Sequence, residues 1–233
     1  MNTESSPVFL HVENLEKSFG GVQALKGLSF KVPQGIIKAI IGPNGAGKTT
    51  LFNVITGILP PNGGAIALNG ISIEGRKARE IARLGVSRTF QNVEVFGRMT
   101  VLENVMVGRH IQSRAGIIST GFRLPGMRRE ERQIRENAMQ HLTFVGLENR
   151  ATELAGNLPL GEQKLLEVAR ALATDPKMLL LDEPAMNLVM DISDEIMVMN
   201  FGEKIAEGKP KQIKNDPLVI EAYLGEEVDY SDL

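Results

Sequence analysis

A glycine-rich stretch at residues 42–50 carries the residue types that bind phosphate. Its sequence, GPNGAGKTT, fits the pattern G-x-x-x-x-G-K-[ST], in which glycines let successive backbone N–H groups point at phosphate oxygens. The pattern places the Lys48 ammonium group at the β- and γ-phosphates and the Thr49 hydroxyl on Mg²⁺. We therefore predict a nucleoside triphosphate site. Its loop residues are Gly42, Pro43, Asn44, Gly45, Ala46, Gly47, Lys48, Thr49 and Thr50.

The elements around this loop are those that must position it. Residues 36–41 form a short apolar run bounded by glycine, as expected of a buried parallel strand. Residues 51–58 carry apolar side chains at helical spacing, so a helix from Lys48 would add the positive end of its dipole. The alternative is a plain glycine-rich turn, against which these flanks argue. A dinucleotide-binding G-x-G-x-x-G pattern is excluded, because its last position, read from Gly45, is Thr50.

A second candidate site follows another apolar run. Residues 178–181 read Met-Leu-Leu-Leu and lead directly to Asp182 and Glu183. A strand this apolar belongs inside a parallel sheet, at whose carboxyl edge ligands bind. We predict that Asp182 holds Mg²⁺ and that Glu183 polarises the attacking water. A strand that ends in a polar turn is the alternative, and the presence of the phosphate-binding loop disfavours it.

A third motif, residues 157–163, opens a helix that we expect over residues 161–173. A helix N-terminus with a glycine and a polar cap can hold an anion. Without the other two motifs, a simple helix start would explain these residues.

Composition limits the class of protein. A chain of 233 residues is long enough for one large α/β domain or a core with a smaller subdomain. The net charge of −2 does not indicate attraction to nucleic acid or anionic lipid. The absence of Cys excludes disulfides and Cys-ligated metal, and the chain has no apolar run that could span a membrane. The polar residues 1–7 lack a signal core, so we expect a soluble intracellular protein.

The periodicity predicts alternating strands and helices. A capping box at residues 100–103 opens a helix toward Gly108, and residues 111–129 are expected to form a loop. Strands are predicted at residues 8–15, 22–32, 36–41, 65–68, 86–90, 178–181, 196–199 and 204–206, with a hairpin turn at Asn69 and Gly70. The other helices are predicted at residues 48–57, 79–83, 130–144, 161–173 and 211–224, and an acidic tail follows at residues 226–232.

The order and spacing of these motifs resemble the ATP-binding subunit of an ATP-binding-cassette (ABC) transporter, from about Phe9 to Pro184. The resemblance implies an α/β P-loop NTPase fold (RecA-like). That fold has a mostly parallel sheet, an N-terminal antiparallel β subdomain and a helical subdomain. It further implies that Phe19 stacks on adenine and that Gln91 contacts Mg²⁺ and couples to the membrane subunit. Residues of the third motif would contact ATP bound to the other protomer: Leu160, Gly161, Glu162 and Gln163.

Within this family, several stretches resemble the subgroup that serves branched-chain amino-acid uptake. Pro159 stands where the family usually has Ser, a variant familiar in that subgroup, and residues 88–92, 99–105 and 222–226 are similar too. Because Pro159 has neither a hydroxyl nor an N–H, backbone N–H groups after it must serve the γ-phosphate.

The resemblance implies ATP and Mg²⁺ as cofactors. It implies as partners transmembrane permease subunits and a second ABC ATPase subunit (identical or different), with a substrate-binding protein as an indirect partner and no nucleic acid. The subunit would lie in the cytoplasm, peripherally on the inner face of the membrane. A single domain is expected over residues 8–233. Its parts are 8–95 (β subdomain and P-loop core), 96–165 (helical subdomain), 166–225 (rest of the core) and 226–233 (acidic tail).

The chain departs from the family pattern after Ala185. The family continues with an Asp-bearing loop, a helix, a strand and a His that touches the γ-phosphate, whereas this chain has no His beyond His141. Only 14 residues separate Leu181 from Ile196, although a strand–helix–strand crossover needs a dozen or more for the crossover alone. One strand and one helix are therefore missing. In the family that strand lies between the P-loop strand and the strand before Asp182.

Three explanations are open, of which we favour the first: an in-frame deletion or a coding-region error, a degenerate paralogue that closes the gap, or an omitted disordered stretch.

Two functions compete accordingly. The first is a peripheral ATPase subunit of a branched-chain amino-acid importer. The second is a nucleotide-binding module, regulatory or vestigial, that is defective in hydrolysis. A soluble ABC ATPase of DNA repair or translation usually has tandem cassettes or long insertions, which are not found here. An exporter-type cassette remains an alternative.

Overall fold

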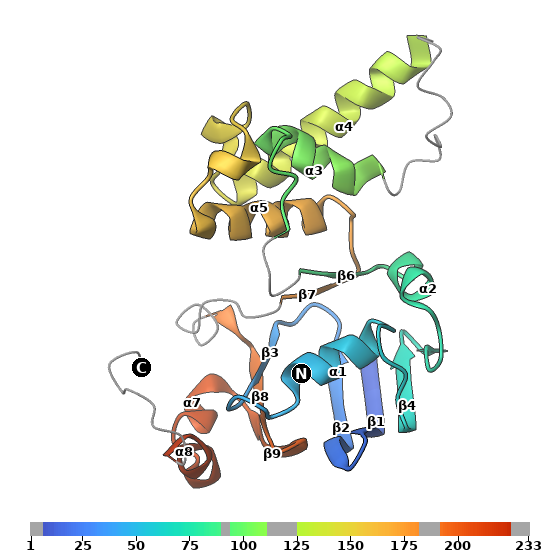
Figure 1. The fold of residues 1–233 in the computed structure, drawn as a ribbon, viewed down its shortest axis with the longest axis vertical. Coiled ribbons are helices and arrows are strands. Elements are labelled where there is room, and N and C mark those ends of the chain that lie inside the picture. The colour runs from blue at the N-terminus through green and yellow to red at the C-terminus, as the bar shows by residue number, and fades with distance from the viewer. Residues whose placement is uncertain (1–6, 90–93, 111–124, 182–191, 225–233) are drawn as a thin grey trace, which may run out of the picture. The chain divides into compact units, whose positions relative to one another are not determined.

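The computed structural model describes residues 7–89, 94–110, 125–181 and 192–224, which divide into two compact units (Figure 1). The first unit comprises Met1–Leu84 and Glu183–Leu233, and the second comprises Gly85–Asp182. Each unit has its own cluster of buried apolar side chains.

The first unit begins with an antiparallel sheet in the order β2-β1-β4-β5. Its strands are β1 (Val8–Phe19), β2 (Val22–Pro33), β4 (Gly63–Leu68) and β5 (Ile71–Ser72). β1 runs four residues beyond the predicted end at Leu15, because Glu16 and Lys17 pair with Lys26 and Leu25 of β2. Asn69 and Gly70 have φ values of 46° and 76°, which confirms the predicted hairpin turn.

A second sheet in this unit carries the strand that precedes the phosphate-binding loop. Its order is β3-β8-β9, with β3 and β8 parallel. The strands are β3 (Lys38–Ile41), β8 (Glu195–Asn200) and β9 (Glu203–Gly208). Ala39 and Ile41 of β3 pack in a buried cluster with Ile196 and Val198 of β8. The burial of four consecutive residues of β8 is typical of a strand that is covered on both faces.

The described residues of this unit also form the helices α1 (Lys48–Ile55), α2 (Ala78–Arg83), α7 (Pro210–Ile213) and α8 (Pro217–Leu224). The prediction of one helix over residues 211–224 is wrong, because the chain forms two. Pro217 lacks an N–H and disfavours a helical conformation at Asp216. The Asp216 side chain instead accepts a hydrogen bond from the Leu218 amide at 2.9 Å and so caps α8.

The second unit holds a parallel strand pair and a group of helices. The strands are β6 (Val86–Arg88) and β7 (Met178–Leu180), and the helices are α3 (Val101–His110), α4 (Pro125–Phe144), α5 (Leu160–Leu172) and the short η2 (Glu148–Arg150) and η3 (Ala155–Asn157). The predicted capping box is confirmed. The Thr100 amide donates to the Glu103 carboxylate at 2.7 Å, and the Glu103 amide donates to the Thr100 hydroxyl at 3.2 Å. The bond from the Thr100 amide lowers the pKa of Glu103.

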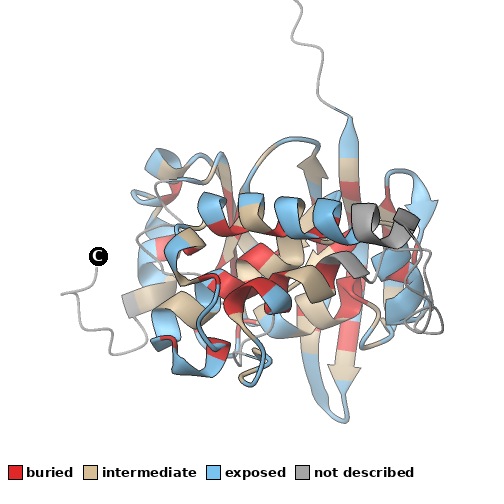
Figure 2. Ribbon diagram, turned by 90° about the horizontal axis from the view of Figure 1, so that it is seen from above, coloured by how far each residue is buried: buried red, intermediate tan, exposed pale blue. Residues whose placement is uncertain are grey.

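The helices of the second unit bury one side each, and Figure 2 shows buried and exposed bands alternating along them. α4 begins at Pro125, so the prediction of a loop over residues 111–129 is wrong for its last five residues. Proline is favoured in the first turn of a helix, where its missing N–H would have no partner anyway. Residues 111–124 of the predicted loop lie outside the described residues.

Both parallel strands that precede a predicted motif stand at the end of their sheet. Among the residues that the structure describes, β3 pairs only with β8, and β7 pairs only with β6.

Candidate functional site

The loop between β3 and α1 has the backbone conformation that its glycines predict. Gly42, Gly45 and Gly47 have φ values of 152°, 80° and 99°. Gly47 is the N-cap of α1, where no side chain caps the helix and no acidic residue stands in the first turn. The first amides of a helix have no acceptor within the helix, so the start of α1 presents N–H donors and a positive dipole end.

Two of these glycines are required by close backbone neighbours. A Cβ atom on Gly42 would lie 2.1 Å from the carbonyl oxygen of Met199, and one on Gly47 would lie 2.6 Å from that of Ala24. Side chains do not fit at such distances. Gly45, by contrast, has nothing within 4 Å of its Cβ position. The loop is thus held tightly on the sides that face β2 and β8.

The Lys48 side chain lies over the start of the loop. Its ammonium group donates hydrogen bonds to the carbonyl oxygens of Gly42 and Pro43, the latter at 2.9 Å. A cation at this place, together with the N-terminus of α1, gives the loop a strongly anion-binding character. The residues present therefore fit a polyphosphate.

Phe19 lies in the same unit, at the end of β1, and 46% of its side chain is exposed. The Lys17 ammonium group lies 5.2 Å from the centre of its ring and donates to the Pro60 carbonyl oxygen at 2.8 Å. Such a contact orients an aromatic ring that solvent or a flat ligand can still reach.

Three of the predicted metal and catalytic side chains are not placed by the structure. Gln91, Asp182 and Glu183 lie outside the described residues. Among the residues that are described, no group of three or more His, Cys, Asp or Glu side chains could hold a metal ion. The roles predicted for these three residues and for the Thr49 hydroxyl stay predictions.

The third motif lies in the second unit and begins α5. Leu158 is buried, whereas Leu160 is 64% exposed and Gly161 has open space at its Cβ position. The Gln163 side chain donates to the Leu158 carbonyl oxygen at 2.8 Å, and the Glu162 carboxylate lies 3.0 Å from the Arg150 guanidinium group. Both contacts stay within the unit, so they fix the motif and leave its first turn open to the surface.

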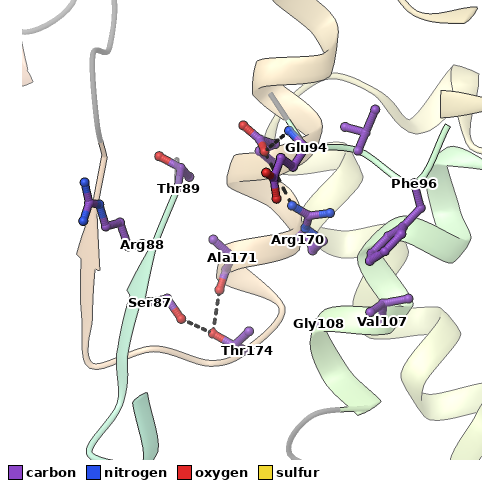
Figure 3. A pocket seen from close by; sticks show the side chains of 12 residues that line it. Ser87, Arg88, Thr89, Glu94, Phe96, Val107, Gly108, Arg170, Ala171 and Thr174 are labelled. Atoms are coloured by element: carbon purple, nitrogen blue, oxygen red, sulfur yellow. Dashed lines mark hydrogen bonds and ion pairs between the residues drawn. The ribbon is translucent and has the colours of Figure 1, made fainter. Parts of the chain in front are cut away.

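The second unit also contains a cavity of about 540 Å³ next to the strand pair (Figure 3). Thr89 and Glu94, on either side of the segment that contains Gln91, line it. The Glu167 carboxylate, 4% exposed, accepts a hydrogen bond from the Glu94 amide at 2.8 Å and lies 3.5 Å from Arg170. The Arg170 guanidinium group lies 5.4 Å from the centre of the Phe96 ring.

Sequence reasoning did not single out this cavity or the backbone neighbours of the loop. A signal for Glu167 was present, since an acidic residue interrupts the buried face of α5 between Leu166 and Ala169. Ala24 and Met199 act through carbonyl groups, which every residue has, so no residue type could have marked them.

None of the helices in the described ranges is both long and apolar enough to cross a bilayer.

The chain matches known protein families and individual relatives. A family model described as "ABC transporter" matches residues 25–186, and one described as "Branched-chain amino acid ATP-binding cassette transporter" matches residues 203–229. The high-affinity branched-chain amino acid transport ATP-binding protein BraF of Pseudomonas aeruginosa is 41% identical, over 95% of this chain and 99% of BraF. LivG of Escherichia coli K12, which bears the same description, matches with the same identity and coverage.

Solved structures agree with these relatives. The ADP conformation of MJ1267, an ATP-binding cassette of an ABC transporter, has a TM-score of 0.78 and 32% identity, over 94% of this chain and 99% of that one.

The alignments also bear on the missing segment. The match to BraF extends over 254 positions but includes only about 221 residues of this chain, which is 95% of 233. About 33 aligned positions therefore have no residue here, enough for a helix, a strand and their connections. The prediction of an internal deletion agrees with this deficit.

The phosphate-binding loop, the fold and these relatives lead to the same family. The chain belongs to the ABC transporter family, as an ATP-binding subunit.

Proposed function

We propose that this chain binds ATP and Mg²⁺ at residues 42–50 and, as an ATPase subunit, drives the uptake of branched-chain amino acids. The observation that carries the proposal is the loop itself. It is held by β2 and β8, and the start of α1 and the Lys48 ammonium group both attract anions there. The names of the relatives, which are branched-chain amino acid transport proteins, support the transported class.

Each residue of the site has a distinct task in this proposal. The loop amides and Lys48 bind the β- and γ-phosphates, and the Phe19 ring packs on the adenine. Thr49, Gln91 and Asp182 hold the Mg²⁺, which neutralises phosphate charge when bound. Glu183 orients the attacking water and accepts its proton.

The proposed partner for hydrolysis is a second ATPase subunit, identical or different. Leu160, Gly161, Glu162 and Gln163 of each subunit would face the nucleotide of the other. The exposure of Leu160 and the open space at Gly161 support this assignment. Backbone N–H groups at the start of α5 would serve the γ-phosphate, because Pro159 cannot donate.

The proposed membrane partners are permease subunits, served in turn by a substrate-binding protein. Their proposed contact lies in the region of Gln91, next to the cavity that Thr89 and Glu94 line. The subunit would then work in the cytoplasm, bound peripherally to the inner face of the membrane.

Two measurements test the nucleotide chemistry: the melting temperature of the purified chain, and phosphate release by the chain together with the permease subunits. Saturating Mg·ATP at about 100 times its Kd stabilises a binding protein by about 2.7 kcal/mol, and we expect the melting temperature to rise by about 5 °C or more. Steady release of phosphate is expected with the permease subunits present. An unchanged melting temperature would contradict the proposal. Leucine uptake by vesicles that contain this chain, the permease subunits and a substrate-binding protein tests the substrate class.

A second candidate is a nucleotide-binding subunit that does not hydrolyse. The roughly 33 absent positions, the sheet ends at β3 and β7 in the described part, and the lack of any His after His141 favour it. It predicts the same rise in melting temperature without phosphate release. Both assays together therefore separate the two candidates.

A further inference from the structure

We infer that the turn between β8 and β9, with Gly202 at its centre, is a positioning element for the phosphate-binding loop. The inference rests on the proposed function, because it concerns how the same loop is held for its triphosphate. Gly202 does not itself contact the proposed ATP and acts only through the backbone of the loop.

A chain of backbone hydrogen bonds runs through Gly202 to the loop. The Lys26 amide of β2 donates to the Gly202 carbonyl oxygen at 3.0 Å, and the Gly202 amide donates to the Ala46 carbonyl oxygen at 3.1 Å. Ala46 lies in the middle of the loop and is 2% exposed. Gly202 therefore links the loop to the N-terminal sheet.

The carbonyl group of Ala24 lies close to both the turn and the loop. A Cβ atom on Gly202 would lie 2.7 Å from the Ala24 carbonyl oxygen, and a Cβ atom on Gly47 would lie 2.6 Å from that oxygen. Anything that pushes Ala24 away from Gly202 therefore moves the group against which Gly47 packs. Gly47 is the N-cap of α1, so such a movement reorients the amides that bind phosphate.

The turn adopts an unfavourable conformation to make these contacts. Phe201 and Gly202 have φ values of 45° and 84°, as in the type I′ turns that Asn-Gly sequences favour. Phe201 is 75% exposed, so burial of its own ring does not explain the conformation. A bulky residue at positive φ persists only where the surroundings impose it. Here the hydrogen bonds that the neighbouring Gly202 donates to Ala46 and accepts from Lys26 hold the turn in place.

The test compares two glycine substitutions of equal backbone strain. Gly202→Ala adds a Cβ atom against Ala24, whereas Gly70→Ala, at a φ of 76°, adds one in open space in the hairpin between β4 and β5. Dissociation constants for Mg·ATP and AMP are measured by calorimetry. We expect Gly202→Ala to weaken ATP about tenfold and AMP much less, which corresponds to the loss of about one hydrogen bond to a charged group. Gly70→Ala should stay within about twofold of the parent.

A measurement on the parent keeps the inference testable if Gly202→Ala does not fold. Bound Mg·ATP should slow hydrogen exchange at the amides of Gly202 and Lys26, together with those of the loop, and leave the turn at Asn69 and Gly70 unchanged. Loop protection without protection of Gly202 and Lys26 would overturn the inference. So would equal ATP affinities of Gly202→Ala and Gly70→Ala. Failure of the parent itself to bind ATP would instead overturn the proposed function.

Discussion

The carbonyl oxygen of Ala24 lies 2.6 Å from the place that a Cβ atom on Gly47 would occupy. This contact joins β2 to the N-cap of the helix that begins at Lys48. The phosphate-binding loop is therefore shaped by a neighbouring strand as well as by its own glycines.

Gly47→Ala tests this contact. Because the substitution combines a φ of 99° with a backbone clash, we expect it to lower the free energy of unfolding by about 2–4 kcal/mol and to abolish ATP-dependent stabilisation. Gly45→Ala is the matched control within the same loop, with a φ of 80° and open space, and should lower stability by about 1 kcal/mol. Urea denaturation measures both. Equal losses in the two variants would show that the Ala24 contact is not important.

Phe201→Asn should stabilise the protein. Asn tolerates positive φ far better than Phe, so we expect a gain of about 0.5–1 kcal/mol in the free energy of unfolding. The control is Phe144→Asn, which removes a ring of similar exposure (78%) from α4 and should bring no gain. A loss of stability in Phe201→Asn would mean that contacts of the Phe201 ring stabilise the protein by more than its positive φ destabilises it.

Glu207→Gln should make stability less sensitive to acid. Burial tends to raise the pKa of Glu207, but hydrogen bonds and charge from Lys204 and Lys38 outweigh it and lower that pKa below its ordinary value of 4.5. A lowered pKa contributes stability above the unfolded value and loses it as pH falls through the folded one.

The free energy of unfolding of the parent should therefore exceed that of Glu207→Gln near pH 7. We expect a difference of only about 1 kcal/mol, because solvent partly screens the ion pairs, and the difference should shrink below about pH 4.5. Unfolding by urea at pH 3.5, 4.5 and 7 measures this. A difference that is constant across these pH values would contradict the assignment.

Glu167→Ala should destabilise the second unit. The substitution removes the buried, charged acceptor of the part-buried hydrogen bond from the Glu94 amide, which costs about 1–3 kcal/mol. Glu167→Gln keeps an acceptor oxygen and should lose less. Glu136→Ala, at an exposed position of α4, should change little. If Glu167→Gln were as damaging as Glu167→Ala, the charge toward Arg170 would matter more than the hydrogen bond.

The sequence predicted most elements because local patterns are strong there. The capping box at Thr100 and Glu103 and the turn at Asn69 and Gly70 involve only neighbouring residues, and both formed as expected. Both errors in the helices arose where proline was misjudged. Pro125 begins a helix that was predicted to start later, and Pro217 separates two helices that were predicted as one.

The candidate site was predicted only where its chemistry resides in side-chain types. Lys48 and the glycines of the loop could be found from their spacing. The supports at Ala24 and Gly202 could not, because their carbonyl and amide groups reach the loop through tertiary packing of strands far apart in the chain. Glu167 is intermediate, since its place on a buried helix face was visible but its acceptor role was not.

Calorimetric titration of Mg·ATP into the parent and into Lys48→Ala tests whether the loop at residues 42–50 binds the triphosphate. The Lys48 ammonium group is the cation that the loop holds beside the Gly42 and Pro43 carbonyl oxygens, so its loss should weaken ATP binding at least tenfold while the melting temperature without nucleotide changes little. Measurable binding by the parent and a large loss in the variant are the predicted result. No binding by the parent, or identical affinities in the two proteins, would show that this loop is not an ATP site.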